Sequence, residues 1–520
     1  MAQYICGIDA GTTGTKIMIF TVDGIPISHA YKEYSCKYPH PGWVEQDPWE
    51  LWHAICEITP KAIAKADINP KEIGSIAISS QRGTFFAIDK DWNPIEDSIV
   101  WSDSRAIKEI KWIGDTLGAE HYHEISGAAM TSLWAYAKYK WVRNNKPALY
   151  DKAWKFVNGQ EWLLHQLGSE ELFTDPSSLA LNGMMDVKTL DWSDELLDAI
   201  GVSRGKLPPI KEPARQVGVV SEIASKLTCF AQGTPICVGG GDQQCAAVGA
   251  GVIKEGLAEI SIGTAAVMVA AVDNIYPDPQ QEVLFSGHAN PGKWDMEGLA
   301  YSSGASLKWW RDTYGDTEAA VARATGTDVY TIISDKEAAR APVGCNGFMF
   351  LPFLATQVSP YYCDTATGGS IGLTNGHDRP MMARAVLEGV AFELRMIVDA
   401  MQHVLGRPFD TIRLSGGGSK SPTWRQIQAD MYGCPVEVLE TADCGLVGAA
   451  ALGATGAGIY KNLKEACNQM VHPKNLIEPN MANYKLYTDM FEIFRDTFLT
   501  LRDVKIYDRL NALSIKYWGY

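Results

Sequence analysis

The chain has 520 residues, of which 46% are hydrophobic and 21% charged, and it contains 48 glycines and 25 prolines. This composition excludes an intrinsically disordered, collagen-like or coiled-coil protein, and the length favours two domains because a single core stops growing near ~250–300 residues. Acidic residues outnumber Lys and Arg by 61 to 46, and the net charge of −15 disfavours nucleic acid and anionic membranes as partners.

The N-terminal residues MAQYICGID show no basic region followed by an apolar one, so the sequence predicts no secretory signal. The longest near-apolar stretch, Ile260–Val272, has 13 residues, whereas a membrane helix needs ~20. The 11 cysteines include no C-x-x-C pair and are typical of buried thiols in a reducing compartment. We therefore expect a cytoplasmic protein with no membrane partner.

A hairpin rich in glycine and threonine opens the chain. Residues 4–8 and 16–20 have the pattern of strands, and Asp9, Gly11, Thr12 and Thr13 lie between them. A related phrase, Ile260–Thr264, repeats the turn with an offset of 252 residues, close to half the chain. This similarity predicts two domains of similar architecture, divided near residue 250.

Both hairpin turns suit the binding of phosphate groups. Their backbone N–H groups are not covered by bulky side chains, and such concave amide clusters bind phosphate oxygens at no net charge. The offset places Ser261 at the position of Asp9, so only one hairpin carries a carboxylate. A single metal ion on one side of a phosphate chain would need this asymmetry.

Polar side chains follow two predicted strands of the first half. Gln81 and Arg82 come after residues 75–78, and Trp101 and Asp103 come after residues 99–100. Open α/β sheets bind ligands at such strand ends. Together these residues offer donors, acceptors and one flat apolar wall, which predicts a pocket for a polyol. We interpret the aromatic stretch from Trp134 to Trp141 as a packed helix face rather than a second pocket.

A triple glycine precedes a carboxylate beside the predicted domain boundary. The strand ending at Val238 breaks into Gly239–Gly241, and Asp242 begins a helix. A carboxylate at this place can take the proton of a substrate hydroxyl as its oxygen attacks phosphorus. The alternative is that Asp242 only caps the helix. A cap, however, explains neither the triple glycine nor the glycine-flanked Asp9.

The second half contains a predicted βαβ unit. A strand over 411–414 runs into Gly416–Gly418, a helix begins at Pro422, and the next strand covers 435–439. Glycines at a helix N-terminus indicate nucleotide contact. Neither a Walker A loop nor a Rossmann fingerprint occurs. The small-residue helix that follows, Gly445–Gly453, is predicted to pack closely on a sheet, and room for a flat ring is the alternative.

Several motifs resemble the FGGY carbohydrate kinases in sequence and in order. They are GIDAGTTGTK, SSQRGT, VWSDSR, GGGDQQ, SIGT, LPFL, RAVLEG and SGGGSKSPTWRQIQAD. The resemblance covers residues 7 to about 458 and implies an α/β fold of two ribonuclease-H-like domains, as in actin, sugar kinases and chaperone ATPases, flanking an interdomain cleft. It implies that residues 1–250 bind the sugar and carry catalysis and that residues 251–520 bind the nucleotide.

The resemblance also implies roles for individual residues, with ATP and Mg²⁺ as cofactors. Asp242 matches the general base, and Asp9 matches the aspartate near Mg²⁺, with Asp242 as a second metal ligand. The expected sugar-binding residues are Gln81, Arg82, Trp101, Asp103, Asp242 and Gln243. The expected nucleotide-binding residues are Gly11, Thr12, Thr13, Lys16, Gly263, Thr264, Gly416, Gly417 and Ser419.

The sequence favours a ketose of about five carbons, phosphorylated at a terminal primary hydroxyl, as in xylulokinases. Gly83 stands where glycerol kinases usually carry Glu, and Arg82-Gly83 stands where xylulokinases usually show Met-His. A glycerol or polyol kinase and a kinase of the autoinducer-2 quorum signal therefore stay open. A non-catalytic sugar sensor and an actin-like ATPase are the alternatives from another class. A homodimer is left open, and residues 461–520 are expected to be helical.

Overall fold

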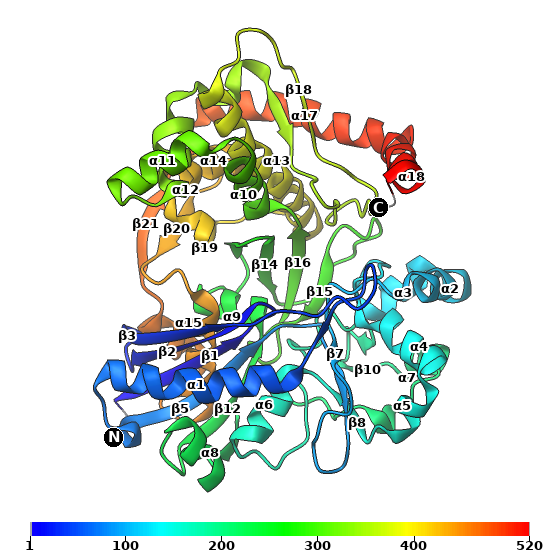
Figure 1. Cartoon of the computed structure of the whole chain (residues 1–520), viewed down its shortest axis with the longest axis vertical. Helices are drawn as coiled ribbons and strands as arrows, with labels where there is room; N and C mark the ends of the chain where they lie inside the picture. The colour runs from blue at the N-terminus through cyan, green and yellow to red at the C-terminus, as the bar shows by residue number, and fades with distance from the viewer. Residues whose placement is uncertain (1–2, 519–520) are drawn as a thin grey trace.

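The computed structural model describes residues 3–518 and contains two large mixed sheets, one above the other in Figure 1. The first sheet has the order β11-β12-β5-β1-β2-β3. Its strands are β1 (Tyr4–Ala10), β2 (Gly14–Thr21), β3 (Pro26–Glu33), β5 (Ile73–Ser80), β11 (Gln216–Val219) and β12 (Pro235–Gly241). β1 pairs antiparallel with β2 and parallel with β5, which pairs parallel with β12.

The second sheet repeats this arrangement in the order β15-β16-β14-β13-β19-β20-β21. Its strands are β13 (Leu257–Ile262), β14 (Ala266–Val272), β15 (Leu284–Gly287), β16 (Trp294–Ala300), β19 (Thr411–Gly416), β20 (Val436–Leu439) and β21 (Pro473–Ile477). β13 takes the place of β1, because it pairs antiparallel with β14 and parallel with β19. The α/β class and the repeated two-domain architecture expected from the sequence are confirmed.

Two helices of small residues cross between the sheets. α9 (Asp242–Gly249) follows β12 of the first sheet yet packs against β13 and β14, whereas α15 (Cys444–Gly456) follows β20 of the second sheet and packs on β1, β5 and β12. A Cβ built at Gly448 would lie 1.8 Å from the carbonyl oxygen of Cys245. Only glycine permits this approach, so the close packing predicted for the small-residue helix is confirmed.

Longer helices cover the outer faces of the two sheets. α1 (Pro48–Ala66) and α6 (Gly159–Leu167) pack on the first sheet. α13 (Arg379–Leu405) and α14 (Pro422–Tyr432) pack on the second sheet, and α10 (Ser303–Tyr314) packs against α13. The start of α14 follows the sequence signals, since the Ser421 hydroxyl accepts from the Trp424 N–H and proline stands at the first helical position. The remaining helices and strands are α2 (Ile107–Leu117), α3 (Ala119–Ser126), α4 (Ala135–Asn145), α5 (Pro147–Lys152), α7 (Asp194–Ile200), α8 (Glu222–Thr228), α11 (Asp316–Thr325), α12 (Val329–Thr331), α16 (Leu463–Met470), α17 (Met481–Asp503), α18 (Ile506–Trp518), β4 (Glu45–Gln46), β6 (Phe86–Ile88), β7 (Ser98–Ile99), β8 (Lys155–Val157), β9 (Met185–Asp186), β10 (Asp191–Trp192), β17 (Met349–Leu351) and β18 (Gly369–Ile371).

An insertion between β5 and β12 forms a smaller body beside the first sheet, where Figure 1 places α2, α3, α4, α5 and α7. It has a hydrophobic core of its own, in which Tyr136 and Tyr139 of α4 are buried. α17 packs against α14 and α13 and buries Tyr487 and Phe494. The helical prediction for residues 461–520 is confirmed for α16, α17 and α18 but is wrong for Pro473–Ile477, which pairs with β20 as the strand β21. No helix among residues 3–518 has both the length and the apolar character needed to cross a membrane.

Candidate functional site

Two cavities meet at the turn between β13 and β14. One, of about 580 Å³, lies between the two sheets and is here called the interdomain cavity. The other, of about 530 Å³, lies beside the end of β19 and is here called the β19 cavity. Gly263 and Thr264 line both. A ligand in one cavity can therefore approach a ligand in the other at this turn.

The interdomain cavity brings together residues from three parts of the sequence. Asp9, Thr12 and Thr13 come from the β1–β2 hairpin, Arg82 and Trp101 from the loops after β5 and β7, and Asp242 and Gln243 from the start of α9. The second sheet contributes Ser261, Gly263, Thr264 and Glu297, and aromatic walls come from Trp134, Tyr301 and Tyr362. The structure thus joins most of the sugar and phosphate residues expected from the sequence.

Asp242 is held by a buried ion-pair network. The Nε of Arg82 donates to Oδ1 of Asp242 at 2.8 Å, and the Arg82 Nη1 and Nη2 groups donate to the two oxygens of Glu297 at 2.5 and 3.0 Å. The pKa of Arg82 is raised although burial acts to lower it, because the two carboxylates favour its charged form. Burial raises the pKa of Glu297, and the Arg82 charge opposes that rise. Asp242 itself stays about one-third exposed to the cavity.

Asp9, the penultimate residue of β1, lines the same cavity. The Ser79 hydroxyl donates to Oδ1 of Asp9 at 2.7 Å. Burial raises the pKa of Asp9 to about 6, and the charge of Asp242 adds to the rise. Lys16, opposite Asp9 in the hairpin, does not line either cavity, because its ammonium group pairs with Asp443 at 2.7 Å.

The first hairpin is tied to the wall of the cavity by side-chain hydrogen bonds. The Trp101 indole donates to the Thr12 hydroxyl at 3.0 Å, and Thr12 donates to Oε1 of Gln81 at 2.7 Å. Gln81 is buried behind the hairpin and donates to Gln46, so it supports the turn and does not line the cavity. Gln243 does line it, and its Oε1 has no hydrogen-bond partner within residues 3–518.

Asp103 lies outside the cavity although it follows a strand as expected. Its carboxylate is fully buried and accepts from Nε and Nη2 of Arg105 at 2.9 and 2.7 Å. The Val44 N–H also donates to it at 2.6 Å. The carboxylate is therefore occupied by internal partners. The position of Asp103 after a strand was predicted correctly. The sequence pattern does not show, however, that Arg105, two residues further on, forms an ion pair with its carboxylate.

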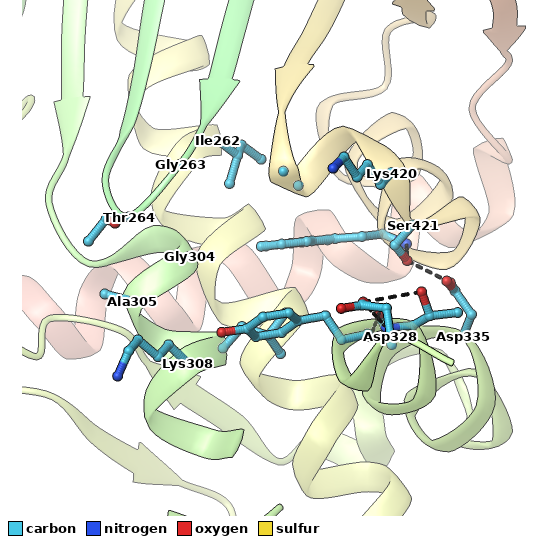
Figure 2. A pocket seen from close by; sticks show the side chains of 17 residues that line it. Ile262, Gly263, Thr264, Gly304, Ala305, Lys308, Asp328, Asp335, Lys420 and Ser421 are labelled. Carbon is cyan, nitrogen blue, oxygen red and sulfur yellow. Dashed lines mark hydrogen bonds between the residues drawn. The ribbon is translucent and has the colours of Figure 1, made fainter. Parts of the chain in front are cut away.

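The β19 cavity is bounded by the second hairpin, α10, α12 and the loop before α14. Gly417 and Gly418 line it, whereas Gly416 and Ser419 lie behind, the Ser419 hydroxyl donating to the Gly416 carbonyl at 2.8 Å. Figure 2 shows Lys308 and Lys420 on different sides and Asp328 and Asp335 close together near Ser421. The aromatic side chains of Tyr330 and Trp424 also line the β19 cavity.

Sequence reasoning missed several of these residues. Glu297 belongs to a strand that is otherwise largely apolar. A charged residue in such a strand is the signal that could have indicated a buried ion pair, because buried carboxylates usually have partners. The acidic residues of the β19 cavity carry no such signal. Asp335 accepts from the Ser421 hydroxyl at 2.6 Å and so lies against the start of α14, 86 residues away in sequence. Trp134 is buried in a hydrophobic core as predicted, and it also lines the interdomain cavity.

The acidic lining also fits a magnesium ion bound to phosphates. Mg²⁺ is usually held by one or two carboxylates together with phosphate oxygens and water. Asp9 and Asp242 supply two carboxylates to one cavity, next to turns that offer backbone amides. Within residues 3–518 no cluster of three or more metal-ligating side chains occurs, so the donors suit an ion that arrives with a phosphate ligand rather than a closed structural site.

Comparisons with known proteins agree with this geometry. A family model described as the N-terminal domain of the FGGY family of carbohydrate kinases matches residues 4–249, and the C-terminal-domain model matches residues 258–457. The crystal structure of ligand-bound xylulose kinase from Lactobacillus acidophilus superposes with a TM-score of 0.87 at 25% identity, over 96% of this chain and 98% of that one.

Curated relatives cover nearly the whole chain and carry different names. Xylulose kinase of Bacillus subtilis is 25% identical over 96% of this chain and 98% of its own length. Glycerol kinase of Solidesulfovibrio magneticus is 31% identical over 93% and 95%. Autoinducer-2 kinase of Klebsiella pneumoniae is 27% identical over 95% and 94%. The matches to both family models, over most of the sequence, show that this chain belongs to the FGGY family of carbohydrate kinases.

Proposed function

We propose that the protein transfers the γ-phosphoryl group of ATP to a terminal hydroxyl of a small, neutral, open-chain sugar, with a pentulose as the favoured acceptor. The observation that carries the proposal is the meeting of the two cavities at Gly263 and Thr264, with Asp242 facing the interdomain side. A nucleotide in the β19 cavity would extend its phosphates through this turn. An acceptor in the interdomain cavity would then lie between those phosphates and Asp242.

In this arrangement Asp242 acts as the general base. Phosphoryl transfer requires alignment and charge stabilisation more than covalent chemistry from the protein. Arg82 holds Oδ1 of Asp242, and the carboxylate takes the proton of the acceptor hydroxyl as its oxygen attacks the γ-phosphorus. The sequence alternative, a plain helix cap, is disfavoured because Gly241 occupies the N-cap position and Asp242 is the first helical residue, whose Oδ1 accepts from Arg82 as well as from the N–H of the next residue, Gln243.

The two hairpins would hold the phosphates from opposite sides. Thr12 and Thr13 offer backbone amides from the first sheet and Thr264 offers one from the second, and the Thr13 and Thr264 hydroxyls add donors. The N–H groups of Gly11 and Gly263 donate within their own turns, at 3.0 and 2.9 Å, so these glycines shape the turns and leave room for the phosphates. Asp9, with Asp242 opposite, would hold a Mg²⁺ ion that neutralises phosphate charge when bound. Gly417 and Gly418 give the nucleotide room beside the lining aromatics Tyr330 and Trp424.

The charges of the interdomain cavity favour a neutral acceptor. Among the described residues that line it, Arg82 is the only cation, and its hydrogen bonds already go to Asp242 and Glu297. A carboxylate on the substrate would lie near three acidic side chains and a guanidinium that is already hydrogen-bonded to two of them. Bringing like charges together costs several kcal/mol. This disfavours an aldonate such as gluconate.

The backbone at Gly83 argues against the usual glycerol-kinase arrangement. Gly83 has φ +67°, where a side chain is strained, and an added Cβ would lie 3.1 Å from Cβ of Leu181. A glutamate therefore does not fit at this position as the loop stands. The walls instead include Trp101, Tyr301 and Tyr362, which suit the carbon chain of a longer sugar.

The test is Mg-ATP-dependent release of ADP with a panel of acceptors: D- and L-xylulose, D- and L-ribulose, glycerol, erythritol, gluconate and the open-chain autoinducer precursor. A neutral pentulose should give the highest kcat/KM. Preference for glycerol, the autoinducer or gluconate would replace the proposed substrate. ATP binding without turnover on any of them would indicate a sensor.

Asp242→Asn should leave ATP and sugar binding within about tenfold but lower kcat by ~10²–10⁴-fold, the usual contribution of a general base. Binding is measured by titration and turnover by coupled ADP release. Unchanged turnover would remove Asp242 from the mechanism.

A further inference from the structure

We propose that Glu297 is a positioning residue for catalysis, which acts through Arg82 to keep one oxygen of Asp242 free for the acceptor hydroxyl. The inference rests on the proposed role of Asp242 as general base. Glu297 stands on β16 of the second sheet, whereas Arg82 follows β5 and Asp242 follows β12 of the first. The orientation of the base therefore depends on a residue of the opposite domain.

The guanidinium of Arg82 donates hydrogen bonds to two carboxylates, those of Glu297 and Asp242. Its two terminal nitrogens donate to the two oxygens of Glu297 at 2.5 and 3.0 Å, and only Nε, at 2.8 Å, donates to Asp242. A forked pair of this kind fixes the plane of the guanidinium. Gln244 also donates to Glu297 at 3.2 Å, which holds the carboxylate in place. The side chains of Arg82 and Glu297 are 3% and 4% exposed.

The hydrogen bonds of Asp242 converge on one of its oxygens. Oδ1 accepts from Nε of Arg82 and from the N–H of Gln243 at 2.9 Å. Among residues 3–518 no hydrogen bond reaches Oδ2. Oδ2 is therefore the oxygen available to a substrate hydroxyl in the interdomain cavity.

Without the charge of Glu297, the terminal nitrogens of Arg82 would be buried and incompletely paired. A buried cation without its partner is costly, and Asp242 is the other carboxylate that already accepts a hydrogen bond from Arg82. The guanidinium of Arg82 would then rotate and form a bidentate pair with Asp242, so that Oδ2 would also accept a hydrogen bond from Arg82. Glu297 prevents this by holding the far end of Arg82.

The same strand offers a matched control. Asp295 lies two residues before Glu297 on the same face of β16, and it is also fully buried. It accepts from the Ser286 hydroxyl at 2.5 Å, and it lines neither cavity. Removing its charge perturbs the same strand without releasing Arg82.

The experiment compares Glu297→Gln with Asp295→Asn, using the acceptor that responds best in the panel. We expect E297Q to lower kcat by about 10–100-fold, the effect of misplacing a reacting group by about 1 Å, with the KM for ATP within about twofold. D295N should keep kcat within about threefold, whatever its Tm. Equal kcat losses in the two variants would overturn the inference and indicate a structural role.

A double-mutant cycle tests whether Glu297 acts through Arg82. In the background of Arg82→Met, adding E297Q should change kcat by less than about twofold, because the group that it restrains is gone. An equally large loss in that background would overturn the inference. Glu297→Asp keeps the charge on a shorter chain, and its kcat should lie between those of the native protein and E297Q. If E297Q does not fold, a native-like kcat in E297D with its Tm preserved supports the inference, and a kcat as low as that of D242N overturns it.

The outcome for Asp242→Asn separates this inference from the proposed function. If D242N turns over normally, the assignment of the base fails and the role of Glu297 fails with it. If D242N is inactive and E297Q is fully active, only the role of Glu297 fails.

Discussion

The two sheets share one topology but carry different side chains at equivalent strand ends. The penultimate residue of β1 is Asp9, whereas that of β13 is Ser261, and β5 is followed by Gln81 and Arg82 where β19 is followed by glycines. α9 begins with Asp242, whereas its counterpart α15 begins with Cys444. Apart from Glu297, the charged residues that line the interdomain cavity come from the first half, and the second half offers backbone amides and space.

This difference explains how a repeated fold supports two binding tasks. In the proposed function, the charged side chains at the strand ends orient and activate the acceptor, whereas the glycine-rich turns accommodate the phosphates through backbone dipoles. The net charge of −15 makes such dipoles important, because the protein as a whole repels phosphate. The halves are also bound together physically, since α9 and α15 each pack on the sheet of the opposite half.

After Asp242→Asn, the largest effect should follow from removing the carboxylate that distinguishes the first hairpin. Asp9→Asn abolishes the charge that would hold the metal ion beside the phosphates, and we expect kcat to fall by ~10²–10³-fold, as for loss of a group that stabilises the transition state. ADP release measured across a range of Mg²⁺ concentrations checks this. Asp91→Asn, at an exposed turn of the same half, is the control. Native-like turnover in D9N would show that the hairpins do not differ in this way.

The interlocked helices predict the next largest effect, on stability. Gly448→Ala places a Cβ 1.8 Å from the Cys245 carbonyl, so α9 and α15 must move apart, and we expect a loss of about 2–3 kcal/mol in the free energy of unfolding. Urea denaturation measures it. Gly376→Ala is the control, because the added Cβ would lie 3.7 Å from the Thr374 hydroxyl, an ordinary van der Waals distance. Equal stability of the two variants would mean that the crossing tolerates a wider separation.

Adding a carboxylate to the second hairpin should partly erase the contrast between the halves. Ser261→Asp sets a negative charge in the interdomain cavity, near the proposed path of the phosphates, and we expect the KM for ATP to rise about tenfold by repulsion. Ser261→Asn adds the same bulk without the charge, and its KM should rise less. Equal KM values for the two variants would assign the effect to bulk.

Local sequence signals predicted the backbone of both halves well. The hairpin turns, the βαβ unit and the helix from Pro422 follow from glycine, proline and capping residues. These features depend on neighbours in sequence. By contrast, β3 reaches Glu33 because its pairing with β2 continues as far as Gly14.

Side-chain partners from distant segments could not be predicted in this way. Glu297 meets Arg82 across 215 residues, and Lys16 meets Asp443 across 427, through sheet registers and helix crossings that no local pattern specifies. Asp103 shows the opposite case. It lies at the strand end where it was expected, but its carboxylate is hydrogen-bonded to Arg105 and does not line the cavity. The sequence therefore locates the strand ends of a site more reliably than it assigns the side chains that line the cavity.

The smallest effect should come from the wall of the interdomain cavity. Trp101→Phe keeps an aromatic ring but removes the indole N–H that donates to Thr12, so the wall loses its link to the first hairpin. A neutral hydrogen bond is worth about 1 kcal/mol, and we expect the KM for the sugar to rise ~3–10-fold while the KM for ATP changes less. Trp112→Phe, on the partly exposed α2, is the control. A rise in the KM for ATP equal to that for the sugar would show that Trp101 serves the phosphate hairpin rather than the sugar, and would move Trp101 from the acceptor side of the comparison to the nucleotide side.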